Sequence, residues 1–208
     1  MLRVAVLISG GGTNLQAIID SIESGKLKNV TIEVVISSKK YAYGLERARN
    51  HGIKGVEIIK KDYSNPALFE EALLDELNSN KIDLVVLAGY LQIVPSKVVK
   101  VYKNRIINIH PSLIPSFCGN GFYGLKVHEE AINRGVKITG ATVHFVDEGT
   151  DTGPIIMQKA VEVKGDDTPE SLQLKVMEEA EWIILPKAIG LIAEDRIIVD
   201  NNVVKIKE

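Results

Sequence analysis

The chain has 208 residues, of which 45% are hydrophobic and 25% are charged, and its formal net charge is −2. A chain of this length can bury a substantial core, as one large or two small domains. Acidic and basic residues nearly cancel and no Lys/Arg block occurs, which argues against nucleic-acid binding. No apolar run is long enough to span a membrane and no signal-peptide pattern opens the chain, so we expect a soluble, cytoplasmic protein.

Cysteine and histidine usage argue against structural disulfides and zinc. The single cysteine, Cys118, cannot form an internal disulfide, and the four histidines are scattered, without zinc-ligand spacing. We therefore predict no metal. A nucleophilic role for Cys118 is also disfavoured, because nothing near it in sequence is expected to lower its pKa.

The first predicted element is an apolar strand over residues 2–9 that runs directly into Gly10, Gly11 and Gly12. Apolar residues then recur at helical spacing from Leu15 onward, so the glycines form a strand-to-helix turn. Free N–H groups and the positive end of the helix dipole make such a turn an anion site. The third glycine of a dinucleotide fingerprint and the Gly-Lys-Ser/Thr signature are missing, which favours a small phosphate monoester over NAD or ATP. The alternative is a tight turn that binds nothing.

Strands and helices then alternate, which predicts a parallel sheet with right-handed crossovers. In chain order we expect a strand over 31–38, a helix through Leu45 and Ala48, a short strand over 56–59, a helix over 65–80 and a buried strand over 82–87. Residues 91–94 come next, and they either pack between a strand and a short helix or line a ligand site.

The stretch from Arg105 to Ser112 alternates isoleucines with polar residues, the pattern of a strand buried on one face, and Pro111 ends it. Asn108 and His110 therefore point the same way at a strand end, where open α/β sheets collect their ligands. An amide and an imidazole in this arrangement could act as an oxyanion donor and a general acid/base. Alternatively, both are structural polar groups with ordinary hydrogen-bond partners.

A loop over residues 117–124 follows, and we expect it to lie at the surface near the site as a mobile lid. The next predicted elements are a helix over 126–134 with His128 on its solvated face, a strand over 138–146 that carries His144, and a strand over 155–163. Between these strands, Asp151 lies in a Gly-rich loop. If this loop folds back on the central strand, Asp151 can pair with His110, orient its ring and raise its pKa.

The last third of the chain predicts a long helix and a hairpin. Residues 167–169, Asp-Thr-Pro, supply an N-cap and a first-turn proline, and Pro186 should kink or divide the helix. We expect only one of Glu178, Glu179 and Glu181 to point inward. Residues 196–206 read as a β-hairpin with turn residues at its tip.

Three segments together resemble the folate-dependent formyltransferase family. They are Ser-Gly-Gly-Gly-Thr-Asn-Leu at 9–15, Asn-Ile-His-Pro-Ser-Leu-Ile-Pro at 108–115, and His-Phe-Val at 144–146 followed by Asp-Thr-Gly-Pro-Ile at 151–155. The resemblance covers essentially the whole chain, including Leu-Ala-Gly-Tyr at 87–90, and its Asn-x-His-Pro-Ser element with the downstream Asp is highly specific.

The resemblance implies an α/β fold with a Rossmann-like, open, mostly parallel twisted sheet, helices on both faces, a long C-terminal helix and a β-hairpin. It also implies a single formyltransferase domain over 1–208, with a phosphate-binding half over 1–110 and a catalytic-loop and folate-pocket half over 111–208. The implied reaction is formyl transfer from 10-formyltetrahydrofolate, a co-substrate, to the amine of glycinamide ribonucleotide in purine biosynthesis. The partners are then small molecules, and the protein is a monomer or homodimer.

The resemblance assigns roles to particular residues. Asn108, His110 and Asp151 match the catalytic positions: Asn108 and a protonated His110 would stabilise an oxyanion, and Asp151 would keep His110 charged. The acceptor-binding positions are Gly10, Gly11, Gly12, Thr13, Asn14 and Glu181. The folate-binding positions are Leu91, Gln92, Ile93, Val94, Asn108, Asp147 and Asp151, with the loop over 147–151 closing over the pterin end.

Two features depart from the family pattern. Pro66 stands where an arginine often helps to bind ligand, and the loop over 117–124 is longer than expected. Related activities remain as alternatives: a formyltetrahydrofolate hydrolase, which usually carries an extra N-terminal domain, and a methionyl-tRNA formyltransferase, which carries a C-terminal RNA-binding domain. We expect this chain to have room for neither domain. A non-catalytic phosphate- or nucleotide-binding module is a further alternative, and the missing third glycine argues against a pyridine-nucleotide reductase.

Overall fold

The computed structural model describes residues 1–207. The backbone divides into two compact units, Met1–Ile107 and a second that begins at Asn108. A seven-stranded sheet has the strand order β3-β2-β1-β4-β5-β6-β7, and β8 and β9 form a separate two-stranded sheet. The predicted α/β class with a mostly parallel sheet is confirmed.

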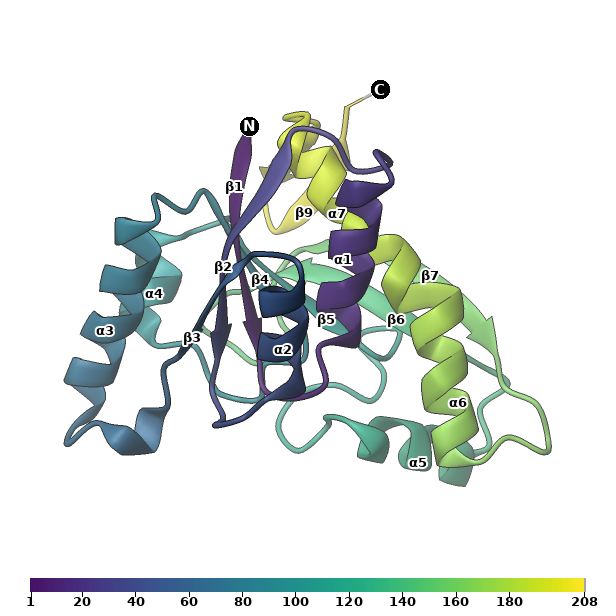
Figure 1. The fold of residues 1–208 in the computed structure, drawn as a ribbon. Helices are drawn as coiled ribbons and strands as arrows, with labels where there is room; N and C mark the ends of the chain where they lie inside the picture. The colour runs from purple at the N-terminus through teal and green to yellow at the C-terminus, as the bar shows by residue number, and fades with distance from the viewer. Residues whose placement is uncertain (208) are drawn as a thin grey trace. The chain divides into compact units, whose positions relative to one another are not determined.

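The first unit consists of alternating strands and helices (Figure 1). Its elements are β1 (Leu2–Ile8), α1 (Thr13–Glu23), β2 (Val30–Ser37), α2 (Tyr43–Asn50), β3 (Lys54–Glu57), a 3₁₀ turn (Lys60–Asp62), α3 (Pro66–Ser79), β4 (Leu84–Leu87) and α4 (Ser96–Val101). Strand β1 pairs in parallel with both β2 and β4, and residues Val4 to Ile8 are fully buried. A continuous apolar strand is typical of this central position, because both of its faces are covered.

The direction of the crossovers reverses between β1 and β4. The chain moves outward from β1 to β2 and β3, and then returns across β1 to form β4. Right-handed connections in opposite directions place their helices on opposite faces of the sheet. In open α/β sheets, ligands bind outside the carboxyl ends of the strands at the point where such a reversal occurs. The glycine turn follows β1 at this edge, and the segment Ala88–Val94 follows β4.

The strand β5 (Ile106–His110) crosses from the first unit into the second. The second unit then contains α5 (Leu125–Arg134), β6 (Ile138–Phe145), β7 (Ile155–Glu162), α6 (Pro169–Val176), a π-helical turn (Met177–Glu181), α7 (Trp182–Ala193), β8 (Ile197–Asp200) and β9 (Val203–Ile206). Strands β6 and β7 are antiparallel, and α6 packs against α5. The predicted hairpin is confirmed; Asn201 and Asn202 at its tip have φ of 47° and 65°, as a type I′ turn requires.

Some boundaries and faces differ from the sequence prediction. Strand β3 begins two residues earlier than the predicted 56–59, because Val56 pairs with Ile36 and the paired stretch ends at Glu57. His128 is 1% exposed, so its placement on a solvated face is wrong. In α5, His128 falls on the same side as Val127 and Ala131, and this side is the buried one.

The long C-terminal helix is interrupted upstream of its proline rather than at it. The irregular turn covers Met177–Glu181, whereas Pro186 lies inside α7. A proline has no N–H for the carbonyl four residues earlier, here that of Trp182, so the disturbance falls on the N-terminal side of the proline. No helix within residues 1–207 is long and apolar enough to cross a membrane.

Candidate functional site

The end of β5 holds His110 in a defined orientation. The imidazole is 4% exposed, and its Nε2 lies 2.9 Å from the carbonyl oxygen of Phe117. Because a carbonyl oxygen only accepts hydrogen bonds, Nε2 carries the hydrogen. In the neutral ring Nδ1 is then the unprotonated nitrogen, and it lies 3.6 Å from Oδ2 of Asp151. Residue 117 thereby fixes which nitrogen of His110 is free to accept a proton.

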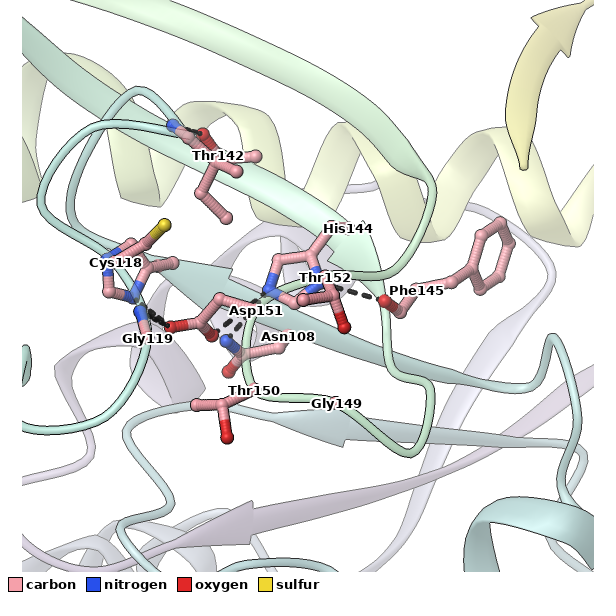
Figure 2. Close-up of polar contacts among 12 residues, drawn as sticks. Asn108, Cys118, Gly119, Thr142, His144, Phe145, Gly149, Thr150, Asp151 and Thr152 are labelled. Carbon is pink, nitrogen blue, oxygen red and sulfur yellow. Dashed lines mark hydrogen bonds and ion pairs between the residues drawn. The ribbon is translucent and has the colours of Figure 1, made fainter.

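Asp151 is placed by the loop between β6 and β7. Its backbone is left-handed, with φ of 58°, which asparagine and aspartate tolerate better than most residues. Oδ2 accepts a hydrogen bond from the N–H of Gly119 at 2.9 Å, and Oδ1 lies 3.5 Å from Nε2 of His144. The predicted return of this loop toward the central strand is confirmed, and it brings Asp151 to His110. Figure 2 shows Asp151 beside Gly119 and His144.

His144, for which the sequence indicated no role, connects two of the predicted residues. Its Nδ1 donates to the carbonyl oxygen of Phe145 at 2.8 Å, so its Nε2 accepts from the side-chain amide of Asn108 at 3.2 Å. The same Nε2 faces Asp151. An amide nitrogen has two hydrogens, so Asn108 keeps a second donor beyond the one directed at His144. Two sequence signals pointed to His144: its position near the end of a strand that borders β5, and its place in the His-Phe-Val segment that resembles the family.

The pKa of His110 is lowered, contrary to the sequence prediction. Burial is the largest cause; the carboxylate of Asp151 and the hydrogen bond to Phe117 oppose it, and His144 adds to the lowering. In Asp151, burial alone would raise the pKa, but the contact with His144, the charge of His110 and the Gly119 N–H together hold it below its ordinary value. The ligand-free site therefore favours a neutral imidazole beside an ionised carboxylate.

Two further titratable groups, His128 and Cys118, interact electrostatically with residues of this cluster. Burial, with a smaller effect of His110, lowers the pKa of His128 to about 4, and within residues 1–207 its Nδ1 has no hydrogen-bond partner. Burial and the charge of Asp151 raise the pKa of the Cys118 thiol, which disfavours the reactive thiolate. The thiol instead donates to the carbonyl oxygen of Pro115.

The glycine turn in the first unit leads into α1 as predicted. Gly12 is the N-cap, with φ of 70°, a conformation that favours glycine. A Cβ on Gly12 would lie 2.7 Å from the Cα of Gly44, whereas Gly10 and Gly11 have nothing within 4 Å. Thr13 is the first residue of α1, and Asn14 is buried in its first turn. The turn therefore needs glycine at position 12 both for its backbone conformation and for its close approach to α2.

The predicted folate-lining segment after β4 is anchored to the end of β1. The N–H of Leu91 donates to Oγ of Ser9 at 2.8 Å, and Ser9 in turn shares a 2.6 Å hydrogen bond with Ser38. Ile93 is 79% exposed and Val94 is buried. Gln92 lies in the same segment, which is irregular; the short helix begins only after Pro95.

The remaining predicted residues belong to the second unit. Asp147 accepts hydrogen bonds from the N–H of Gly149 and the hydroxyl of Thr152, so it shapes the loop that carries Asp151. Glu181 is 5% exposed, whereas Glu178 and Glu179 are not buried, so the expectation of one inward carboxylate is confirmed. Within residues 1–207, no group of three or more His, Cys, Asp or Glu side chains is arranged to hold a metal ion.

Comparison with known proteins points to one family. Residues 2–189 match the family described as formyl transferase. Phosphoribosylglycinamide formyltransferase of Haemophilus influenzae is 40% identical over 202 residues, which cover 97% of this chain and 92% of that protein. A crystal structure of glycinamide ribonucleotide transformylase 1 from Symbiobacterium toebii has a TM-score of 0.93 and 44% identity, and the match covers 100% of this chain and 95% of the other.

Some relatives are longer than this chain. Chloroplastic phosphoribosylglycinamide formyltransferase of Arabidopsis thaliana is 40% identical over 197 residues, which cover 94% of this chain and 66% of that protein. The chain thus spans just under two thirds of this plant relative.

Proposed function

The chain belongs to the formyl transferase family, and from that premise we propose that it is a phosphoribosylglycinamide formyltransferase, an enzyme of purine biosynthesis. It transfers the formyl group of 10-formyltetrahydrofolate to the primary amine of glycinamide ribonucleotide, which yields the N-formylated ribonucleotide and tetrahydrofolate. The observation that carries the proposal is the cluster of Asn108, His110 and Asp151, joined by His144.

The neutral state of His110 suits it to the role of a base. The acceptor amine attacks the formyl carbon, and the amine nitrogen must then lose a proton. Nδ1 of His110 takes this proton, because Nε2 is already committed to Phe117. The nearby Asp151 carboxylate stabilises the imidazolium that results. His110 then returns the proton to the departing folate nitrogen.

The oxyanion of the tetrahedral intermediate needs a donor that is already in place. The second N–H of the Asn108 amide supplies it, and His144 holds the amide by accepting from the first. Protonated His110 adds a charged group only once it has received the proton. This order differs from the sequence prediction, in which His110 is protonated from the start, because burial lowers its pKa in the free protein.

We assign the phosphate of the acceptor to the glycine turn. Residues Gly10 to Asn14 combine free backbone N–H groups with the N-terminus of α1, which suits a phosphate monoester. Glu181 is assigned to the acceptor's amino group. For the folate we propose the segment from Leu91 to Val94, together with Asp147, Asp151 and Asn108.

The proposal also includes predictions about domain organisation, oligomeric state and cellular location. They are a single formyltransferase domain, a monomeric or homodimeric state and a cytoplasmic location, although two plant relatives are chloroplastic by name.

The test is a transfer assay with purified protein and 10-formyltetrahydrofolate, with and without glycinamide ribonucleotide. Absorbance follows the release of deformylated folate, and mass spectrometry identifies the product. Release that requires the acceptor and gives its formylated form supports the transferase. Release without acceptor would identify a hydrolase, and no release in either case would leave a phosphate-binding protein without this activity.

A further inference from the structure

The glycine turn is tied to α2 by two hydrogen bonds from different kinds of donor. The backbone N–H of Gly44 donates to the carbonyl oxygen of Gly10 at 3.0 Å. The guanidinium Nε of Arg47 donates to the carbonyl oxygen of Gly11 at 2.8 Å. Two consecutive carbonyls of the turn are thereby pulled toward the same helix.

This arrangement sets the direction of the next two N–H groups. A trans peptide places its C=O and the N–H of the following residue on opposite sides. With the carbonyls of Gly10 and Gly11 drawn to α2, the N–H groups of Gly11 and Gly12 point away from α2. Successive N–H groups that point the same way form an anion-binding concavity.

Arg47 is itself held at both ends of its guanidinium. Its Nη1 donates to Oε1 of Gln16 at 3.0 Å, and the group lies over the ring of Tyr43 at 5.0 Å from the centroid. Gln16 belongs to α1, so the guanidinium joins the turn, α1 and α2. The planar fork of arginine holds its donors in fixed directions that suit both hydrogen bonds at once, whereas a lysine ammonium carries the same charge without that geometry.

We propose that Arg47 is a positioning residue for phosphate binding, which it controls by orienting the peptide groups of the glycine turn rather than by touching the reacting atoms. The inference rests on the proposed function, in which this turn holds the phosphate of the acceptor. Removal of Arg47 frees the Gly11 carbonyl to rotate, and the oriented N–H groups are then partly lost. The change falls on the KM for the phosphorylated substrate and not on turnover or on the KM for the folate.

The test compares Arg47→Met with Arg49→Met, which removes a neighbouring arginine of α2 that pairs with Glu46. Calorimetric titration with ribose 5-phosphate and with inorganic phosphate measures binding, and transfer assays measure kcat and both KM values. We expect Arg47→Met to weaken ribose 5-phosphate binding about tenfold, as loss of a charge-assisted hydrogen bond implies, and to raise the acceptor KM equally. Arg49→Met should match the wild type.

A third variant, Arg47→Lys, separates orientation from charge and carries the test if Arg47→Met does not fold. We expect it to lose most of the affinity. Wild-type affinity in Arg47→Lys, or equal affinity in the two methionine variants, would overturn the inference, as would a fall in kcat with an unchanged acceptor KM. Calorimetry does not depend on catalysis, so a wild-type protein that binds ribose 5-phosphate but transfers no formyl group contradicts the proposed function and leaves Arg47 testable.

Discussion

Two histidines of the second unit, His110 and His128, have pKa values below that of a free imidazole, with burial as the largest cause in each. The consequences differ. His110 keeps two polar neighbours, the Phe117 carbonyl and Asp151, and so remains able to take up a proton during a reaction. His128 has no hydrogen-bond partner for Nδ1 within residues 1–207, so protonation there opposes folding.

Replacement of His110 tests the chemical step alone. His110→Ala should lower kcat by at least about a hundredfold, the scale found when a group that stabilises the transition state is lost. The binding of ribose 5-phosphate should stay unchanged, because that ligand is assigned to the glycine turn. Turnover and calorimetric affinity are the two measurements, with Arg49→Met, at an exposed arginine, as the control. Near-normal turnover in His110→Ala would remove this residue from the mechanism.

The lowered pKa of His110 has a kinetic signature. If Nδ1 must be unprotonated to accept a proton, kcat/KM falls as the pH drops through the pKa of His110 in the free enzyme. That pKa lies below the ordinary histidine value of 6.5, so the acid limb should also lie below 6.5. A pH profile of kcat/KM measures it. An acid limb above 6.5, or activity that rises on acidification, contradicts a neutral His110 as the base.

Acid should destabilise the fold through His128. Its pKa is about 4 when folded, against the ordinary histidine value of 6.5 in the unfolded chain. Between these values the unfolded chain binds more protons, so stability falls as the pH is lowered from 6.5 toward 4. The full shift corresponds to about 3 kcal/mol. Urea unfolding at pH 7 and 4.5 should show most of this loss in the wild type and a smaller loss in His128→Leu.

At the scale of elements, helix α6 begins with a capping box, in which two side chains each accept a hydrogen bond from the other residue's backbone. Oγ1 of Thr168 accepts from the N–H of Ser171, and Oγ of Ser171 accepts from the N–H of Thr168. Pro169 then occupies the first helical position. The sequence predicted this start, because capping depends on residues that are adjacent in the chain.

We predict that loss of the capping box lowers the stability of the fold and leaves the activity of the site unchanged. Thr168→Ala removes the side-chain acceptor at the start of α6 and should lower the free energy of unfolding by about 1 kcal/mol. Thr168→Ser keeps the hydroxyl and should recover most of that loss. Urea unfolding at neutral pH measures both variants, and kcat should not change in either. Equal stability of the alanine and serine variants would mean that the hydroxyl contributes nothing to the cap.

At the scale of the whole molecule, a ligand that binds only the folded protein raises its stability. Ribose 5-phosphate at about 100 times its Kd should add about 2.7 kcal/mol. Gly12→Ala should abolish this increment, because its Cβ would lie 2.7 Å from the Cα of Gly44 and its φ of 70° is strained. Gly165→Ala lies outside the turn and its added Cβ would also have nothing within 4 Å, so it is the matched control and should keep the increment. Thermal unfolding with and without ligand gives the increments, and an equal increment in both variants contradicts a shaped glycine turn.

Local patterns of residues were enough to predict much of this protein. Apolar runs, glycine turns and caps act between neighbours in the chain, so β1, the turn at Gly12, β5, the start of α6 and the final hairpin could all be predicted. The shared direction of Asn108 and His110 followed from strand periodicity. The resemblance to the family was likewise found from short sequence motifs, each of which is continuous in the chain.

The charge state of the site was decided only by tertiary structure. Burial of His110 depends on packing between segments far apart in the chain, and it outweighs the Asp151 carboxylate that the sequence suggested would raise the pKa. The same holds for the buried face of His128, for His144 between Asn108 and Asp151, and for the Arg47 bond to Gly11. Sequence order determines which groups are present and which strand or turn carries them. Desolvation and long-range contacts, which exist only in the folded chain, decide what those groups do.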